Sequence, residues 1–249
     1  MKQMEADIIL FDEVDSTNTV LKRMADDGAK EGTCVIALSQ RKGQGRYGRT
    51  FYSPHGNLYM SLLLRPEDDK LFEMITVIAG VAAAEAINEF YKIPVGIKWV
   101  NDIIVNEKKA GGIVAQSYDI GKSSRYVILG IGINIYEAED VPDEIRDIYT
   151  SLTGAHNKVS GSKEIESFAR TIIRSFSRYY DSGLIKEAVG RYRQLSCVIG
   201  KMVEYVSGSG TIQARVCGIS DDGGLIVETP GGKKCFRDGE IRIRQALSP

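Results

Sequence analysis

The sequence predicts an α+β fold, with a mixed-sheet domain over residues 1–196 and a small β-barrel over residues 197–249. A chain of 249 residues has room for one large and one small domain. Its hydrophobic share of 43% and charged share of 26% are typical of a soluble globular protein. The composition changes at Lys201, where short strand-like runs separated by glycine-rich turns begin.

Strands and helices both occur in the first half of the larger domain. Ser16 or Thr17 is expected to cap a helix that is closed by Gly28. Apolar residues that recur at helical spacing predict a long helix over 70–91. Strands are expected at 7–11, 33–39 and 57–64.

The second half contains short strands, two helices and then the barrel. Strands are expected at 96–99, 103–105, 112–118 and 126–133, with turns at 106–108 and 121–122. Two helices follow, over 163–180 and 184–194. From Lys201 the runs KMVEYV, TIQARVCGI, LIVETP, KKCFRD and EIRIRQ predict five strands, a unit too small to be a second enzyme.

The cysteines give no sign of a disulfide framework or a metal site. They form no C-x-x-C pair, and their apolar or β-branched neighbours predict buried free thiols at Cys34, Cys197, Cys217 and Cys235. With no signal peptide at the N-terminus, we expect a cytoplasmic protein. The longest apolar stretch, 74–87, is interrupted by Gly80 and Glu85 and is too short to span a bilayer, so no membrane contact is expected.

Positive charge is concentrated in one segment of an otherwise balanced chain. The net charge of −1 gives no reason to expect nonspecific nucleic-acid binding. No acidic residue occurs between Glu31 and Glu67, whereas five basic residues do: Arg41, Lys42, Arg46, Arg49 and Arg65. The only histidines are His55 and His156, so histidine metal sites and Ser-His-Asp triads are poorly supplied.

The basic segment contains GQGRYG at 43–48, which has the G-x-G-x-x-G spacing of a dinucleotide-binding turn. In that turn the third glycine opens a helix whose N-terminus meets the pyrophosphate. Here Pro54 and Gly56 would break a helix soon after Gly48, and the next residues alternate like a strand. The sequence therefore predicts a flexible cationic loop between two strands, suited to a phosphate or a carboxylate. A solvated basic loop and an RNA contact are the alternatives.

Two further stretches carry polar groups at the ends of elements. DSTN at 15–18 brings two hydroxyls and an amide to a helix N-terminus, where they suit a cap or the polar head of a ligand. KWVND at 98–102 places the only tryptophan, Trp99, before Asn101 and Asp102 at a strand end. Trp99 suits a pocket wall and a core position equally.

Glycines and charge also meet near the middle of the chain. In KKAGGIVAQ (108–116), Gly111 and Gly112 would let a ligand lie against the backbone, and Lys109 would reach its charge. An exposed turn lysine is the alternative for Lys109. GIGIN (130–134) ends a strand on Asn134, where sites often lie.

Taken in order, these motifs resemble those of the biotin protein ligase family. DSTN, the loop Q-x-x-G-x-G-R-x-G-R from Gln40 to Arg49, K-W-x-N-D, K-x-x-G-I and G-x-G-I-N have the family's order and spacing. The resemblance extends through the C-terminal barrel and implies a biotin/lipoate ligase-like mixed sheet with an SH3-like barrel. Gln44 stands where a loop arginine is usual, Val100 where proline is common and Gly111 where alanine is common.

The resemblance implies two half-reactions. Biotin and ATP would first give biotinyl-5′-AMP and pyrophosphate, and a lysine of a biotin carboxyl carrier protein would then attack the anhydride and release AMP. Neither step requires a protein nucleophile, which suits a sequence without a plausible triad. Because two anions must be joined, catalysis would depend on positioning and charge neutralisation. Mg²⁺ on the phosphates is expected.

By resemblance, Lys109 and Arg46 are the expected catalytic residues, and Asp102 is the expected carboxylate near Mg²⁺. The expected biotin-binding residues are Ser16, Thr17, Asn18, Gln40, Gln44, Gly45, Arg46, Trp99, Lys109 and Gly112. The expected ATP- and adenylate-binding residues are Arg46, Arg49, Asn101, Lys109, Asn134, Phe236 and Arg244. Residues 41–52 are expected to become ordered around the anions.

Two other functions compete with this one. A lipoate or octanoate protein ligase or transferase shares the fold and the transfer to lysine, but Gln40 and DSTN favour the ureido ring of biotin. An RNA-binding module would use the basic loop and the barrel, against which stand the net charge and the isolated aromatic residues of the barrel. Only 14 residues precede DSTN, so the resemblance implies the ligase-only type without DNA binding, and a homodimer is expected.

Overall fold

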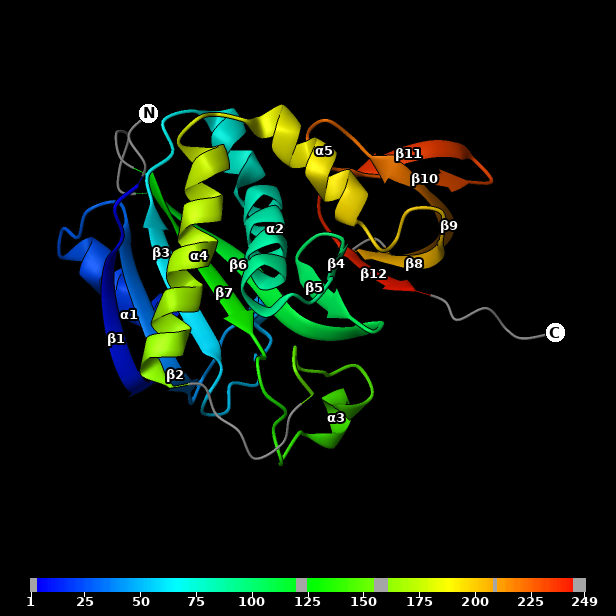
Figure 1. Cartoon of the computed structure of the whole chain (residues 1–249). Helices are drawn as coiled ribbons and strands as arrows, with labels where there is room; N and C mark the ends of the chain where they lie inside the picture. The colour runs from blue at the N-terminus through cyan, green and yellow to red at the C-terminus, as the bar shows by residue number, and fades with distance from the viewer. Residues whose placement is uncertain (1–3, 120–124, 155–160, 208–209, 244–249) are drawn as a thin grey trace.

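The computed structural model describes residues 4–119, 125–154, 161–207 and 210–243, which form two sheets and the helices around them (Figure 1). The larger sheet has the strand order β1-β2-β3-β7-β6-β5-β4. Strands β1 and β2 pair in parallel, and the other neighbours pair antiparallel, so the expected mixed sheet is confirmed. The strands are β1 (Asp7–Val14), β2 (Thr33–Gln40), β3 (Leu58–Leu64), β4 (Gly96–Lys98), β5 (Asp102–Val105), β6 (Lys108–Asp119) and β7 (Arg125–Ile133).

The helices cover the two faces of this sheet unequally. The long helix α2 lies on one face, with α4 and α5 beside it (Figure 1), and α1 packs on the other face through Leu21 and Ala25. Asp68 begins α2 by accepting a hydrogen bond from the Leu71 amide, 2.6 Å away. The helices are α1 (Thr17–Asp26), α2 (Asp69–Tyr91), α3 (Asp143–Arg146), α4 (Ser162–Tyr180) and α5 (Ile185–Leu195).

Helix α2 is hydrophobic because most of its side chains are buried in the core. The helix has 23 residues and is long and apolar enough to cross a membrane, which the expectation from the 74–87 stretch did not anticipate. However, 72% of its most apolar window is buried inside the molecule. Its apolar face lies between the large sheet and helices α4 and α5.

The smaller sheet is antiparallel and has the order β11-β10-β9-β8-β12. Its strands are β8 (Met202–Ser207), β9 (Gly210–Ile219), β10 (Leu225–Thr229), β11 (Gly232–Phe236) and β12 (Glu240–Ile243). The expectation of buried thiols is wrong for Cys217 and Cys235, which are exposed because β9 and β11 turn one side to solvent, and Cys197 is half-buried. Cys34, near the start of β2, is buried as expected.

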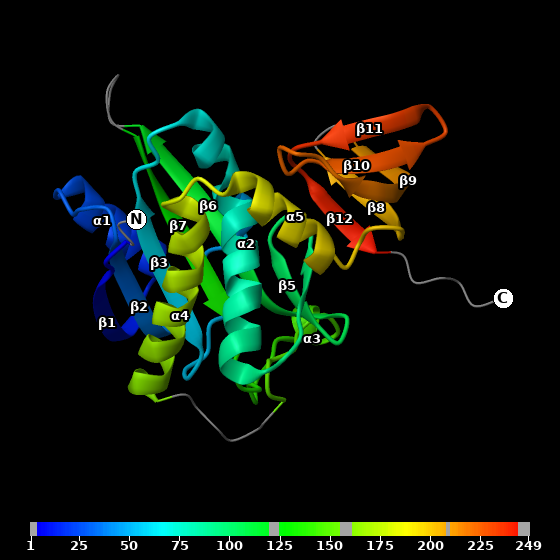
Figure 2. The same cartoon turned by 45° about the horizontal axis from the view of Figure 1, so that its top comes forward.

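The connection between the two sheets is itself hydrogen-bonded to the larger one. Ser196 forms a parallel bridge with Ile97, and the Cys197 amide donates to the Ile97 carbonyl at 3.0 Å. Arg193, near the end of α5, donates to the Ile219 carbonyl at 2.7 Å. The smaller sheet therefore lies against α5 (Figure 2), and the residues that lead into it are bonded to β4. The boundary between residues 196 and 197 stays a prediction.

Candidate active site

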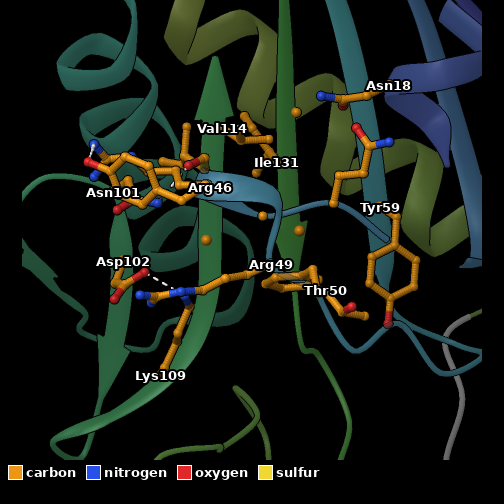
Figure 3. A pocket seen from close by; sticks show the side chains of 18 of the residues that line it. Asn18, Arg46, Arg49, Thr50, Tyr59, Asn101, Asp102, Lys109, Val114 and Ile131 are labelled. Carbon is orange, nitrogen blue, oxygen red and sulfur yellow. Dashed lines mark hydrogen bonds and ion pairs between the residues drawn. The ribbon is translucent and has the colours of Figure 1, made fainter. Parts of the chain in front are cut away.

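A cavity of about 130 Å³ opens on the face of the larger sheet that carries α1. Its wall is formed by the start of α1, residues 44–51 of the basic loop, the turn between β4 and β5, and the start of β12 (Figure 3). We call residues 41–52 the glycine loop. It joins β2 to β3, as expected, and contains a single helical turn at Arg46–Gly48 rather than a continuing helix.

The floor of the cavity is the bare backbone of β6 and β7. Gly112 pairs with Gly132, and Val114 pairs with Gly130, so three glycines lie side by side on this face. A Cβ added at Gly132 would lie 2.6 Å from the Phe51 ring, and one at Gly130 would overlap Oδ1 of Asn18. These glycines therefore leave room for neighbouring side chains and for a ligand.

Gly111 has a different reason for lacking a side chain. A Cβ there would lie 2.6 Å from Cδ1 of Ile133, on the core side of the sheet. Of the two glycines that were expected to let a ligand lie against the backbone, Gly112 lines the cavity and Gly111 does not.

A β-bulge directs Lys109 into the cavity. The pairing of β5 with β6 shifts after Ile103, which leaves Ala110 as an extra residue. In a regular strand Lys109 and Gly112 would point to opposite faces, and the bulge returns them to the same side. The Lys109 ammonium lies 2.6 Å from Asp102 Oδ1, and Lys98 lies 3.9 Å from the other oxygen of this carboxylate.

The α1 end of the cavity is polar and uncharged. The Thr17 amide and hydroxyl both donate to Oε1 of Gln40, at 2.9 and 3.1 Å, and Nε2 of Gln40 donates to Ser53 at 3.0 Å. The buried hydroxyl of Ser61 lies 2.6 Å from Oδ1 of Asn18 and 2.8 Å from Oγ1 of Thr17. This hydroxyl has one proton, so it can donate to only one of the two oxygens at a time.

The start of α1 differs from the expected cap. Ser16 occupies the N-cap position, but its side chain accepts no hydrogen bond from the first turn. Instead, the Gln40 side chain, at the end of β2, caps the helix by accepting a hydrogen bond from the Thr17 backbone amide. The Ser16 side chain, 2% exposed, lines the cavity instead.

The opposite end of the cavity is cationic, and its arginines are paired with the smaller sheet. Arg46 and Tyr47 both bond Asp238, and Arg49 forms two hydrogen bonds with Glu240, one of them 2.6 Å long. The Tyr47 hydroxyl, 2.7 Å away, contributes most to a lowered pKa of Asp238, and Arg49 lowers the pKa of Glu240. The concentration of positive charge in the glycine loop is therefore balanced by acidic residues that are distant in sequence.

The structure brings most of the predicted residues together. The cavity is lined by the whole expected biotin-binding set: Ser16, Thr17, Asn18, Gln40, Gln44, Gly45, Arg46, Trp99, Lys109 and Gly112. Of the expected ATP-binding set, Arg46, Arg49, Asn101 and Lys109 line it, as does Asp102. Trp99 fits both of its interpretations, because it is 3% exposed in the core and also forms part of the wall.

Two expected nucleotide-binding residues, Asn134 and Phe236, do not line the cavity. Asn134 is buried behind the wall, where Nδ2 donates to the Thr150 carbonyl and Oδ1 has no hydrogen-bond partner among the described residues. Phe236 does not line the cavity and stacks on Tyr205, with ring centroids 3.8 Å apart. Arg244 lies outside the described residues.

Sequence reasoning missed Lys98, Phe51, Tyr59 and the 239–241 segment, all of which line the cavity. Lys98 could have been included because it belongs to the KWVND motif. The barrel residues gave no such signal, because they meet the glycine loop only through the tertiary fold.

Comparison with known proteins identifies the family of the chain. Residues 10–134 match the biotin/lipoate A/B protein ligase family, and residues 198–244 match the biotin protein ligase C-terminal domain. The chain is 33% identical to the bifunctional ligase/repressor BirA of Bacillus subtilis (strain 168), over 95% of this chain and 74% of that protein. The chain belongs to the biotin protein ligase family.

Other relatives agree with this assignment. The ligase is 26% identical to the biotin–[acetyl-CoA-carboxylase] ligase of Paracoccus denitrificans, over 91% of this chain and 96% of that one. Its structure resembles the biotin protein ligase of Aquifex aeolicus solved in complex with biotin and ATP, with a TM-score of 0.80, 31% identity, and coverage of 96% and 99% of the two chains. The expected family and the expected fold are therefore confirmed.

Proposed function

We propose that this ATP-dependent biotin protein ligase makes biotinyl-5′-AMP in the cavity and then transfers biotin to a lysine of a biotin carboxyl carrier protein. One observation carries the proposal: a single cavity has an uncharged polar end and a cationic end above a floor of glycine backbone. Figure 3 shows Asn18 and Tyr59 on one side of it and Asp102, Lys109 and Arg49 on the other. The C-terminal match to biotin protein ligases favours biotin over lipoate or octanoate.

The polar end suits the ureido ring of biotin. Thr17, Asn18 and Gln40 offer donors and acceptors without charge, which matches a neutral ring that both donates and accepts hydrogen bonds. Between the two ends, Val114 offers an apolar contact for the valeryl chain. The carboxylate would then lie toward Lys109.

The cationic end suits the reacting groups. A biotin carboxylate oxygen attacks the α-phosphorus, the bond from this phosphorus to the β-phosphate oxygen breaks, and pyrophosphate leaves. The Lys109 ammonium reduces the repulsion between the two anions, and Arg46 and Arg49 hold phosphate oxygens in place of Asp238 and Glu240. The carrier amine then attacks the carbonyl carbon, AMP leaves with the C–O electron pair, and the amine loses its proton.

Asn134 suits the adenine. Its buried Oδ1 is an acceptor without a partner among the described residues, and such an atom is costly unless something donates to it. The 6-amino group of adenine is a donor of the right kind. The backbone N–H of Asn134 donates to the carbonyl of Ala110, the extra residue of the bulge. The contact with adenine would therefore form next to the bulge that directs Lys109 into the cavity.

Mg²⁺ is expected as part of the MgATP substrate. Among the described residues no group of three His, Cys, Asp or Glu side chains could hold a metal ion. Asp102 is a single carboxylate that already pairs with two lysines, so it does not form a resident site. That Asp102 approaches the metal of MgATP stays a prediction, as do a cytoplasmic location and a homodimer.

Exchange of labelled pyrophosphate into ATP, with biotin, lipoate and octanoate supplied separately, tests the proposal. We expect exchange with biotin alone and its loss when Mg²⁺ is chelated. Lys109→Met should reduce the exchange rate about 100-fold or more, as loss of one transition-state donor typically does. Lys108→Met is the matched control, because Lys108 is exposed on the same strand and does not line the cavity. Exchange with lipoate or octanoate but not biotin would refute the substrate assignment.

A further inference from the structure

Gln116 lies on β6 beyond the far edge of the cavity, and its side chain joins two separate parts of the site. It does not line the cavity but lines a hollow between β6 and the glycine loop. Its Oε1 accepts from Asn18 Nδ2 at 2.9 Å and from the Tyr118 hydroxyl at 3.3 Å. Its Nε2 donates to Oε1 of Gln44 at 3.3 Å. Gln116 therefore connects the polar end of the cavity to the glycine loop.

The connection continues through the polar end and returns to the loop. When Ser61 donates to Asn18 and accepts from the Thr17 hydroxyl, the path runs from Asn18 through Ser61 to Thr17. The backbone amide of Thr17 donates to Gln40, and Gln40 donates to Ser53, the residue directly after the glycine loop. Gln44 begins this path within the loop. A ligand that bonds Asn18 or Thr17 therefore acts on both ends of the loop.

Gln44 and Gln116 are chemically matched. An arginine is usual at the position of Gln44, and a guanidinium has only donors, so it could not accept from Nε2 of Gln116. Gln44 accepts there and donates to the Thr19 hydroxyl at 3.3 Å. The chain thus has a neutral amide pair at a point where the family pattern has a cation.

We propose that Gln116 is a positioning residue that couples biotin recognition by Asn18 to closure of the glycine loop through Gln44. The proposal rests on the proposed function for the identity of the ligand, but the coupling itself is a property of the hydrogen-bond path. The Gln44–Gln116 pair would hold the loop over the cavity without relying on charge, so this hold should be insensitive to salt.

The coupling is tested with Gln116→Leu, which removes the hydrogen bonds to Asn18 and Gln44, and Gln116→Glu, which preserves them. The glutamate still accepts from Asn18, and the Gln44 amide can turn over to donate to it. Gln213→Leu, an exposed glutamine on β9, is the matched control. A net hydrogen bond of about 1 kcal/mol corresponds to an effect of about fivefold.

The first measurement is the rate of tryptic cleavage within the glycine loop, without ligand. We expect Gln116→Leu to be cleaved about fivefold faster than wild type, and Gln116→Glu and Gln213→Leu at the wild-type rate. Gln44→Ala should also accelerate cleavage, and the double variant should be no faster than either single one. Wild-type cleavage of Gln116→Leu, or additive effects of the two variants, would overturn the coupling.

The second measurement is the biotin dependence of pyrophosphate exchange. Gln116→Leu should raise the KM for biotin about fivefold with kcat little changed, and Gln116→Glu should restore it. A lower kcat with an unchanged KM would overturn the coupling to biotin recognition. If wild type forms no biotinyl-AMP, the proposed function fails, and the cleavage measurement still decides whether Gln116 holds the loop.

Discussion

The indole N–H of Trp99 donates to the carbonyl oxygen of Gly223, 2.9 Å away in the turn between β9 and β10. One buried side chain therefore forms part of the cavity wall and holds the smaller sheet against it. The turn also rests on α2, because a Cβ at Gly223 would lie 2.8 Å from the Val77 side chain. Movement of this turn and the shape of the cavity should consequently be linked.

Trp99→Phe keeps an aromatic wall but removes the donor. The Gly223 carbonyl would lose its partner in a buried position, which costs about 1–3 kcal/mol of unfolding free energy. Urea denaturation followed by far-UV circular dichroism measures this loss. Tyr192→Phe is the control, since it removes a hydrogen bond to the Val100 carbonyl within the larger domain. We expect both variants to be destabilised and only Trp99→Phe to weaken ATP binding. Equal ATP affinities would contradict the link.

Gly130→Ala should damage the polar end of the cavity. The added methyl group would overlap Oδ1 of Asn18 and displace that side chain, so we expect biotin affinity, measured by calorimetry, to fall by at least tenfold. Gly190→Ala in α5 is the opposite control, because nothing lies within 4 Å of its added Cβ. That change should stabilise the helix by about 0.5–1 kcal/mol. Unchanged biotin affinity in Gly130→Ala would show that Asn18 can move without consequence.

The contact between Asp238 and the glycine loop should depend on pH. Hydrogen bonding by Tyr47 contributes most to a pKa of Asp238 below its ordinary 3.8. A carboxyl group with a lowered pKa stabilises the fold above its ordinary pKa and loses that contribution as the pH falls through the lowered value. Asp238→Asn should therefore reduce the Tm at pH 5–7, by less than about 4 °C for an exposed pair, and this difference should diminish as the pH falls below the ordinary pKa of 3.8. A Tm difference that stays constant as the pH is lowered through this range would contradict this origin.

The cysteines should react in two classes. Cys217 and Cys235 are exposed and should be modified by a thiol reagent in the native protein. Cys34 is buried, and burial raises the pKa of its thiol to about 12, so it should react only after unfolding, even at pH 9. Mass spectrometry of peptides from native and urea-treated samples distinguishes the two classes. Native labelling of Cys34 would place it nearer the surface than the sheet allows.

The succession of elements could be predicted because its signals are local. Helical spacing placed the long helix at 70–91, and it spans Asp69–Tyr91; the five C-terminal runs became β8 to β12. The short helix α3 was missed because four residues are too few to show a period. The turn expected at 121–122 lies outside the described residues.

The site was only partly predictable because its finer features are tertiary. Nothing in the sequence near Arg46 or Arg49 points to Asp238 or Glu240 as partners. Likewise, Gln40 replaces Ser16 as the acceptor at the start of α1 because β2 ends at Gln40, beside that helix. The bulge at Ala110 depends on how β5 pairs with β6, and no local pattern reveals this register. The order of the motifs along the chain was therefore enough to predict many of the residues that line the cavity, but not which hydrogen-bond and ion-pair partners they have.

The hydrogen bonds of Ser196 and Cys197 with β4 limit how freely the C-terminal part of the chain can be exchanged for that of a relative. A chain cut after residue 195 would lose the pairing along β4, the acceptor for the Trp99 indole and the cover over part of α2. An open strand edge and newly exposed apolar surface favour association between copies. The C-terminal part therefore does not behave as an exchangeable module. Its replacement by a homologous segment should succeed only where the exchanged segment includes residues that pair with β4.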